Sequence, residues 1–176
     1  MDMRRATTAT LLIVVPCAAL LGACAGTDLK PIASFGASNM LSPSGYAETK
    51  VSDSQYQVKA TGTEATPKSR IEKIARARAA QIGIEQKLGY YKVANVQYGV
   101  VCDKKHEFYK GGATASGSRQ TVQVDVVYAK EPLDPTYVSA KESFEALNGE
   151  LNNEVVPADA KAVAEQESRA ACGQAT

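Results

Sequence analysis

The stretch TVQVDVVY, residues 121–128, decides the fold of this chain because it is the clearest β-strand in the sequence. Apolar and polar side chains alternate along it, which is typical of a strand with one buried face. The side chains expected to face the core are Val122, Val124, Val126 and Tyr128. Those expected to face outward are Thr121, Gln123 and Asp125. A sheet built around this strand needs a second layer over its apolar face.

A helix predicted over residues 67–88 supplies that layer. Thr66 suits the N-cap, Pro67 suits the first helical position, and Gly89 suits the end of the helix. Apolar side chains recur at the helical period: Ile71, Ala75, Ala79 and Ile82, extended by Ile74, Ala77, Ile84 and Leu88. Charged side chains gather on the opposite side: Glu72, Lys73, Arg76 and Lys87. We interpret the charged side as a solvated helix face.

Three more strands flank the helix in the sequence. Residues 46–51 and 55–61 alternate on either side of Ser52-Asp53-Ser54, which predicts a β-hairpin. Residues 90–102 form a long strand after the helix, and a slip in the alternation at Ala94-Asn95 predicts a β-bulge. The order β-β-α-β-β favours an α+β fold in which one small sheet carries a helix packed on one face.

The segments on either side of this domain have weaker patterns. Residues 24–44 contain Gly, Ser, Ala, Pro and Asn without a sustained period and predict a flexible tether before a domain at 45–130. Residues 131–176 contain a helical stripe after Asp134 and an Ala-, Glu- and Lys-rich run whose apolar side chains are small. We expect a weakly structured tail there, helical or partly disordered, and no second domain.

The first residues of the chain have the layout of a targeting signal. Arg4 and Arg5 precede an apolar run over residues 9–21, and the small residues Gly22-Ala23 follow it. The run has about 13 apolar residues, whereas a transmembrane helix needs about 20. A removable signal therefore fits better than a membrane-spanning helix.

The residues Leu21-Gly22-Ala23-Cys24 resemble the lipobox of bacterial lipoproteins. The resemblance implies that residues 1–23 are a signal peptide and that Cys24 carries a diacylglyceryl thioether and an acyl chain such as palmitate on its amino group. Several acyl chains on one residue form a stable membrane anchor. Ala25 in the next position implies sorting to the outer membrane, with the protein facing the periplasm. A secretory signal without lipid is the alternative.

Part of the domain is also similar to a family of small proteobacterial lipoproteins that has no assigned activity. The similarity covers residues 45–101 and rests on an ordered set of motifs: Gly45-Tyr46 and Tyr56-Gln57-Val58 in the hairpin, Arg76-Ala77-Arg78-Ala79-Ala80 in the helix, and Gly89-Tyr90-Tyr91 before the long strand. The resemblance implies an envelope location and this fold, and it leaves the activity open.

Two cysteines remain once Cys17 leaves with the signal and Cys24 takes the lipid: Cys102 and Cys172. An even pair in an oxidising compartment predicts one disulfide. Two unpaired thiols are the alternative, because Cys172 lies close to the end of the chain.

The composition and the motifs argue against nucleic-acid binding and against catalysis. The chain has 20 basic and 19 acidic residues, and Arg4, Arg5 and Asp2 lie in the signal, so the mature protein has no net charge to attract nucleic acid. The single histidine, His106, forms only a two-ligand set with Cys102, and zinc needs three or four ligands. Neither a nucleophile elbow nor a P-loop occurs in the sequence. We predict no cofactor, no metal site and no catalytic residues.

These observations favour a non-catalytic, lipid-anchored module that binds another envelope component, either a protein or peptidoglycan. Tyrosine suits such contacts because its ring is apolar and its tip is polar, and the candidates on the sheet are Tyr46, Tyr56 and Tyr98. Two other classes stay open: a stress or redox sensor that uses a Cys102–Cys172 bond, and a cell-envelope hydrolase.

Overall fold

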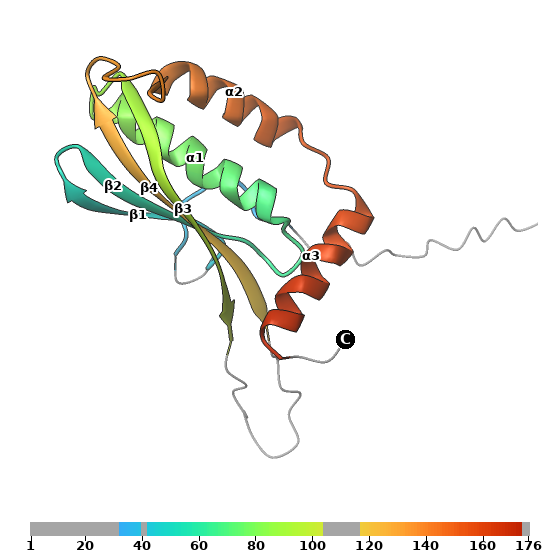
Figure 1. Ribbon diagram of the computed structural model, residues 1–176. Helices are drawn as coiled ribbons and strands as arrows, with labels where there is room; N and C mark the ends of the chain where they lie inside the picture. Colours follow the sequence, from blue (N-terminus) through green and yellow to red (C-terminus); the bar gives the residue numbers. More distant parts are fainter. Residues whose placement is uncertain (1–31, 40–41, 104–116, 174–176) are drawn as a thin grey trace, which may run out of the picture.

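One antiparallel sheet and three helices build the domain (Figure 1). The computed structural model describes residues 32–39, 42–103 and 117–173 of the 176-residue chain. In chain order the elements are β1 (Gly45–Ser52), β2 (Gln55–Thr61), α1 (Lys68–Glu85), β3 (Tyr90–Cys102), β4 (Ser118–Ala129), β5 (Val138–Ser139), α2 (Ala140–Asn153) and α3 (Ala158–Ala171). The strands lie in the order β1-β2-β4-β3-β5 across the sheet. The predicted α+β class and the β-β-α-β-β order are confirmed.

The elements are stacked in layers. The sheet forms the first layer, α1 lies across β2 and β4, and α2 lies on α1 (Figure 1). α3 covers the end of the sheet where β3 finishes and β4 begins. All three helices therefore lie on the same side of the sheet.

The alternation of β4 sets the core of the molecule. The four side chains predicted to face inward are buried: Val122, Val124, Val126 and Tyr128. They meet the apolar side of α1, which is also buried: Ile71, Ala75, Ala79 and Ile82. The hydroxyl of Tyr128 donates a hydrogen bond of 2.7 Å to the carbonyl oxygen of Ala79, so the polar tip of this tyrosine is paired inside the core.

The hairpin and the β-bulge predicted for the other strands are both confirmed. β1 and β2 form the expected hairpin. The register of β3 against β4 shifts between Val93 and Asn95, where the bulge is predicted. Because of the shift, Tyr91 before the bulge and Val96 and Tyr98 after it lie opposite inward-facing residues of β4, on the helix-covered side of the sheet.

α1 is buried on two sides because it lies between the sheet and α2. All four of its alanines are fully buried, and small residues let the two helices approach closely. A Cβ atom added at Gly83 would lie 2.9 Å from the Cβ atom of Ala140 in α2. Lys73, assigned to a solvated face by the sequence pattern, pairs instead with Glu150 of α2 and with Glu154, the residue that follows α2. The single apolar side that the periodicity predicts is therefore only part of the buried surface.

The start of α1 differs from the prediction by one position. Pro67 is the N-cap, and α1 begins at Lys68. The Oγ1 atom of Thr66 accepts hydrogen bonds from the N–H groups of Thr63 and Ala33, at 2.9 and 3.0 Å. Thr66 therefore fixes the preceding loop and the N-terminal segment, and it does not cap the helix.

The end of α1 is a Schellman motif with a lysine at the position where glycine is usual. Lys87 has a φ of 58°, in the left-handed region. The N–H groups of Lys87 and Leu88 donate to the carbonyl oxygens of Ile84 and Gly83, at 3.1 and 2.8 Å. These bonds end the helix before Gly89, so the predicted stop at Gly89 is wrong.

Replacing Lys87 with glycine should raise the free energy of unfolding by about 0.5–1 kcal/mol, because glycine takes the left-handed conformation without a steric cost. Urea denaturation of the wild type and Lys87→Gly measures the change. The control is Gln86→Gly: Gln86 has a φ of −85°, so glycine there relieves no strain and should lower stability. A loss of stability in Lys87→Gly would contradict the prediction.

Residues 32–39, which the sequence pattern assigned to a flexible tether, pack against the domain. Ala33 is fully buried. The ring of Phe35 lies between the rings of Tyr46 and Phe144, with centroid distances of 5.2 and 6.1 Å. The same segment forms a parallel β-bridge to Tyr46 at the outer side of β1. The domain therefore includes chain that comes before Gly45.

The segment after Lys130 is helical, as predicted, and it is attached more firmly than its weak apolar pattern indicates. α2 packs along α1 and buries Leu151. α3 buries Ala164 and Ser168 against the end of the sheet. The contacts of α3 include hydrogen bonds, ion pairs and a disulfide, and apolar periodicity does not report such contacts.

Candidate functional site

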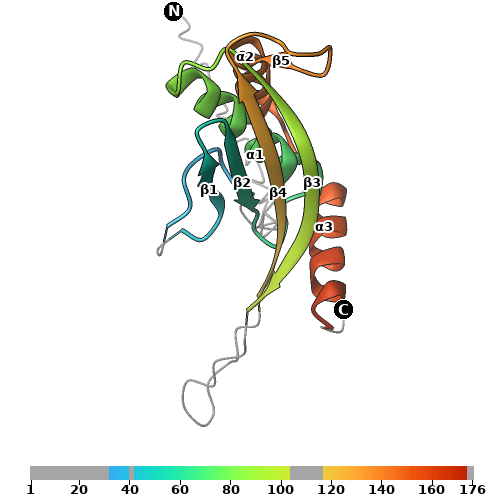
Figure 2. The ribbon, with the colours of Figure 1, turned by 60° about the vertical axis from the view of Figure 1, so that its left-hand side comes forward.

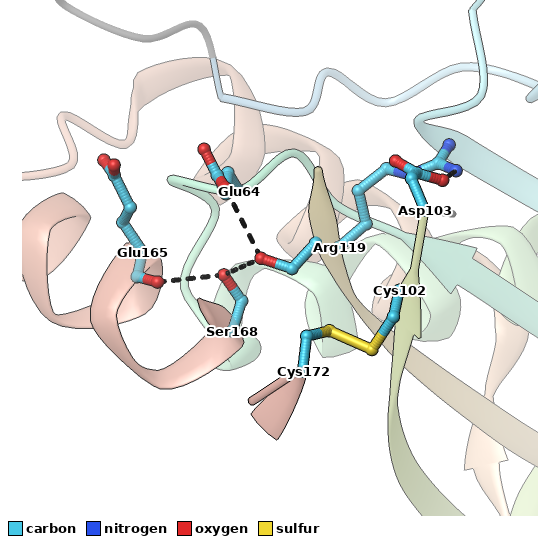
Figure 3. The surroundings of a disulfide bond; sticks show 8 residues. Glu64, Cys102, Asp103, Arg119, Glu165, Ser168 and Cys172 are labelled. Atoms are coloured by element: carbon cyan, nitrogen blue, oxygen red, sulfur yellow. Dashed lines mark hydrogen bonds and ion pairs between the residues drawn. A yellow bond between two sulfur atoms is a disulfide. The ribbon is translucent and has the colours of Figure 1, made fainter. Parts of the chain in front are cut away.

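The two cysteines predicted to pair form a disulfide. Cys102 is the last residue of β3, and Cys172 follows α3 directly (Figure 3). Their sulfur atoms are 2.05 Å apart and their Cα atoms 5.6 Å apart. The bond ties α3 to the end of the sheet, and the alternative of two free thiols is wrong.

Hydroxyl groups lie in the contact between α3 and β4 next to the disulfide (Figure 3), together with the side-chain amide of Gln120. Ser118 of β4 and Ser168 of α3 are both buried, and the Ser118 hydroxyl donates to Oγ of Ser168 at 2.9 Å. The Ser168 hydroxyl donates in turn to the carbonyl oxygen of Glu165 at 3.0 Å. Nε2 of Gln120 donates to the carbonyl oxygen of Ala164 at 2.9 Å. A mostly polar contact therefore holds α3 on the sheet.

Ion pairs frame the same contact. Nε of Arg169 in α3 donates to a carboxylate oxygen of Glu64 at 3.3 Å. Arg119 of β4 pairs with Asp103, the residue after Cys102, at 2.5 Å. A serine nucleophile needs a base to take its proton, whereas the hydroxyl of Ser168 is committed to a main-chain carbonyl. This arrangement supports a structural role for the polar cluster.

Of the two residues in the Cys102–His106 pair, only Cys102 lies in the described part of the chain. His106 lies outside the described residues. The sulfur of Cys102 is held in the disulfide, so it is not the thiolate that a metal ligand or a nucleophile requires. Within residues 32–39, 42–103 and 117–173, no group of three or more His, Cys, Asp or Glu side chains could hold a metal ion.

A second candidate site is the outer edge of β3. This strand pairs with β4 along its length, but β5 pairs only with its first two residues, Tyr90 and Tyr91. From residue 92 to Cys102, β3 has no second neighbour among the described strands (Figure 2). Such an edge directs N–H and C=O groups away from the sheet, where another strand can bond to them.

A groove of about 430 Å³ lies beside this edge, at the bulge of β3. Its walls include Tyr91 and Asn95 from β3, Arg76 from α1 and Thr136 from the loop before β5. The groove therefore begins where β5 stops pairing with β3.

Glu72 fixes two side chains next to this edge. One of its carboxylate oxygens accepts a 2.7 Å hydrogen bond from Nε of Arg76, and the other accepts a 2.7 Å bond from the hydroxyl of Tyr98. The bond from Tyr98 is the main reason that the pKa of Glu72 lies below its usual value, and Arg76 lowers it further against the opposing effect of burial. The same bond raises the pKa of Tyr98. At neutral pH Glu72 is a carboxylate that orients both neighbours.

The three tyrosines predicted to offer contacts have different surroundings. Tyr98 is 56% exposed beside the β3 edge. Tyr46 is partly buried under the guanidinium of Arg78, which lies 5.2 Å from the ring centroid. Tyr56 is buried, and its ring packs edge-on against Tyr128. Tyr56 is therefore a core residue and is not available to a partner.

The sequence pattern did not identify Glu72 and Arg76 as part of a site. Their spacing of four residues on one helix was a visible signal of an ion pair. Both residues lie beside the β3 edge because of the order in which the strands pair. A single sequence does not record that pairing.

The predicted lipidation residue, Cys24, lies outside the described residues. Within the described ranges, the helices are all too short or too polar to cross a membrane. Neither a family model, nor a curated protein, nor a solved structure matches this chain. The geometry of the molecule is therefore the basis for assigning a function.

Proposed function

We propose that this protein is a non-catalytic lipoprotein of the outer membrane that faces the periplasm and binds another envelope component through the free edge of β3. The observation that carries the proposal is the edge from residue 92 to Cys102, which is paired with no strand in the described part of the chain. Addition of an extended segment to such an edge is a recurring mode of protein recognition. The segment would gain main-chain hydrogen bonds without any change in the sheet.

Two observations support the envelope location. The residues Leu21 to Cys24 have the lipobox pattern, and the apolar run before them is the length of a signal. The Cys102–Cys172 bond suits an oxidising compartment such as the periplasm. Lipid on Cys24 would hold the domain at the membrane surface and bring the β3 edge close to other envelope proteins.

Site-specific photo-crosslinking in cells tests both halves of the proposal. A photoreactive amino acid is placed at Tyr98, beside the β3 edge, or at Val51 in β1, the opposite edge strand of the sheet. These two positions are matched in exposure, at 56% and 57%. We expect one discrete adduct from position 98, none from position 51, and loss of both the adduct and the membrane association in Cys24→Ala.

Each half of the proposal has its own contrary result. Equal adducts from positions 98 and 51, or none from either, would contradict binding at the β3 edge. Membrane association that is unchanged in Cys24→Ala would contradict the lipid anchor. The control for protein amount is immunoblotting of the same cells.

A further inference from the structure

The two edges of the sheet differ in charge. Residues 93–101 of β3 read VANVQYGVV and contain no charged side chain. β1, at the opposite edge, contains Glu48 and Lys50 and meets the N-terminal segment at Tyr46. Natural proteins protect edge strands from pairing with charges, bulges or covering segments. β1 has two of these protections, whereas β3 has a bulge at one end and, after Tyr91, no covering strand among residues 32–39, 42–103 and 117–173.

β5 determines where an added strand must stop. It occupies the place beside Tyr90 and Tyr91, so a segment that pairs with the rest of β3 ends next to the bulge and the groove. All neighbouring strands in this sheet are antiparallel. A segment that continues this pattern would place its C-terminal end at the groove, because β3 begins there.

Arg76 lies at that end, and one of its three guanidinium nitrogens is hydrogen-bonded. Its Nε is bonded to Glu72, and its two terminal nitrogens have no hydrogen-bond partner within the described part of the chain. These nitrogens form the planar pair that binds a carboxylate with two parallel hydrogen bonds. The bond to Glu72 fixes the orientation of the pair, and Arg76 forms part of the wall of the groove.

We propose that the β3 edge binds the C-terminal segment of a partner protein as an added antiparallel strand, with the terminal carboxylate of that segment bound by Arg76. This inference rests on the proposed function of the β3 edge and names the chemistry of its partner. The uncharged residues 93–101 favour a strand of alternating apolar and neutral polar residues. A strand of about eight residues, at about 3.3 Å per residue, covers most of the free part of β3.

The test uses the full chain in detergent with its disulfide intact and two synthetic peptides. Both are octapeptides of alternating valine and threonine with an acetylated N-terminus, and one ends in a free carboxylate while the other ends in an amide. Amide chemical shifts measured by NMR locate the binding, and calorimetry measures the affinity. We expect shifts along residues 92–102 and affinity at least about tenfold weaker for the amide peptide, since a charge-assisted pair is lost.

Arg76→Met should remove the preference for the carboxylate peptide and leave binding of the amide peptide unchanged. The matched control is Lys59→Met, which removes one positive charge from β2 on the uncovered face of the sheet and should keep the preference. Equal affinity of the two peptides for the wild type would overturn the role of Arg76 and leave binding at the edge standing.

The remaining outcomes separate this inference from the proposed function. Failure of both peptides to bind, together with an adduct at position 98 in cells, would overturn the C-terminal partner alone. If neither peptide binds and position 98 gives no adduct in cells, the inference and the proposed function are overturned together. Shifts along β3 that depend on protein concentration without peptide would identify a second copy of the chain as the occupant, which also overturns the inference.

Discussion

Replacing Arg70 with methionine lowers the free energy of unfolding by about 3 kcal/mol, the loss typical of a broken buried ion pair. Arg70 is only 6% exposed, and it joins three parts of the chain. Nε donates to the carbonyl oxygen of Ala33 at 3.0 Å, the terminal nitrogens donate to that of Leu151 at 3.3 and 3.2 Å, and Nη1 bonds to Glu154 at 2.8 Å. Methionine removes the side-chain donor from the carbonyl oxygens of Ala33 and Leu151, and it leaves Glu154 with only its bond to Lys73.

Urea denaturation followed by circular dichroism measures this loss, with Arg76→Met as the control on the same helix. Arg76 is 37% exposed and pairs with Glu72 one turn away, so its replacement should cost at most about 0.5 kcal/mol. Equal losses in the two variants would mean that the contacts of Arg70 do not stabilise the junction of α1, α2 and the N-terminal segment.

Arg70→Met should also make stability less sensitive to acid. Burial acts to raise the pKa of Glu154, but hydrogen bonds from Arg70 and Lys73 outweigh it and hold this pKa below the ordinary value of 4.5. Because the pKa of Glu154 is lower in the folded state than in the unfolded state, the ionised carboxylate stabilises the fold at pH values above the ordinary pKa. This contribution is lost as the pH falls through the lowered pKa of the folded state. The wild type should therefore lose more stability than Arg70→Met between about pH 6 and about pH 3.

Removing the disulfide is expected to lower the free energy of unfolding by about 2–4 kcal/mol and to loosen α3 before the rest of the domain. The variant is Cys102→Ser combined with Cys172→Ser. Without the bond, α3 would be held mainly by the hydrogen bonds of Ser118 and Gln120 and by ion pairs at its surface. Each such hydrogen bond contributes only about 1 kcal/mol.

Hydrogen exchange read by mass spectrometry gives the location of the change. Amides of residues 158–171 should exchange faster in the double variant, while those of α1 and β4 stay protected. Ser168→Ala with the disulfide intact is the control, and α3 should remain protected in it. A uniform change across the domain would contradict a local role for the bond. Trapping of free thiols in cells would show whether the bond opens there, which a redox sensor requires.

Features that depend on local sequence were predictable. The alternation of β4 correctly identified its inward face, and the slip at Ala94-Asn95 correctly located the bulge. An even number of cysteines predicted the disulfide. In each case the signal lies within a few residues or in a simple count, so no knowledge of distant partners was needed.

Features that depend on distant partners were not predictable. The packing of residues 32–39 depends on Phe144, more than 100 positions away. The end of α1 before Lys87 was missed because a lysine with positive φ is uncommon and leaves no mark in the composition. The free edge of β3 is a property of the strand order. Tyr56 is different: its own strand already placed it on the side of Val58 and Ala60, so its burial could have been predicted.

The position of β4 also constrains the order in which the chain can fold. β4 lies between β2 and β3, yet it follows both in the sequence, and it pairs Gln55 with Val127 across most of the domain. During synthesis β2 therefore has no inner neighbour until residues 118–129 have emerged. Such non-local pairing slows folding and leaves apolar strands exposed for longer. Under the envelope location proposed above, export of an unfolded chain would let the sheet close only after the whole chain has arrived.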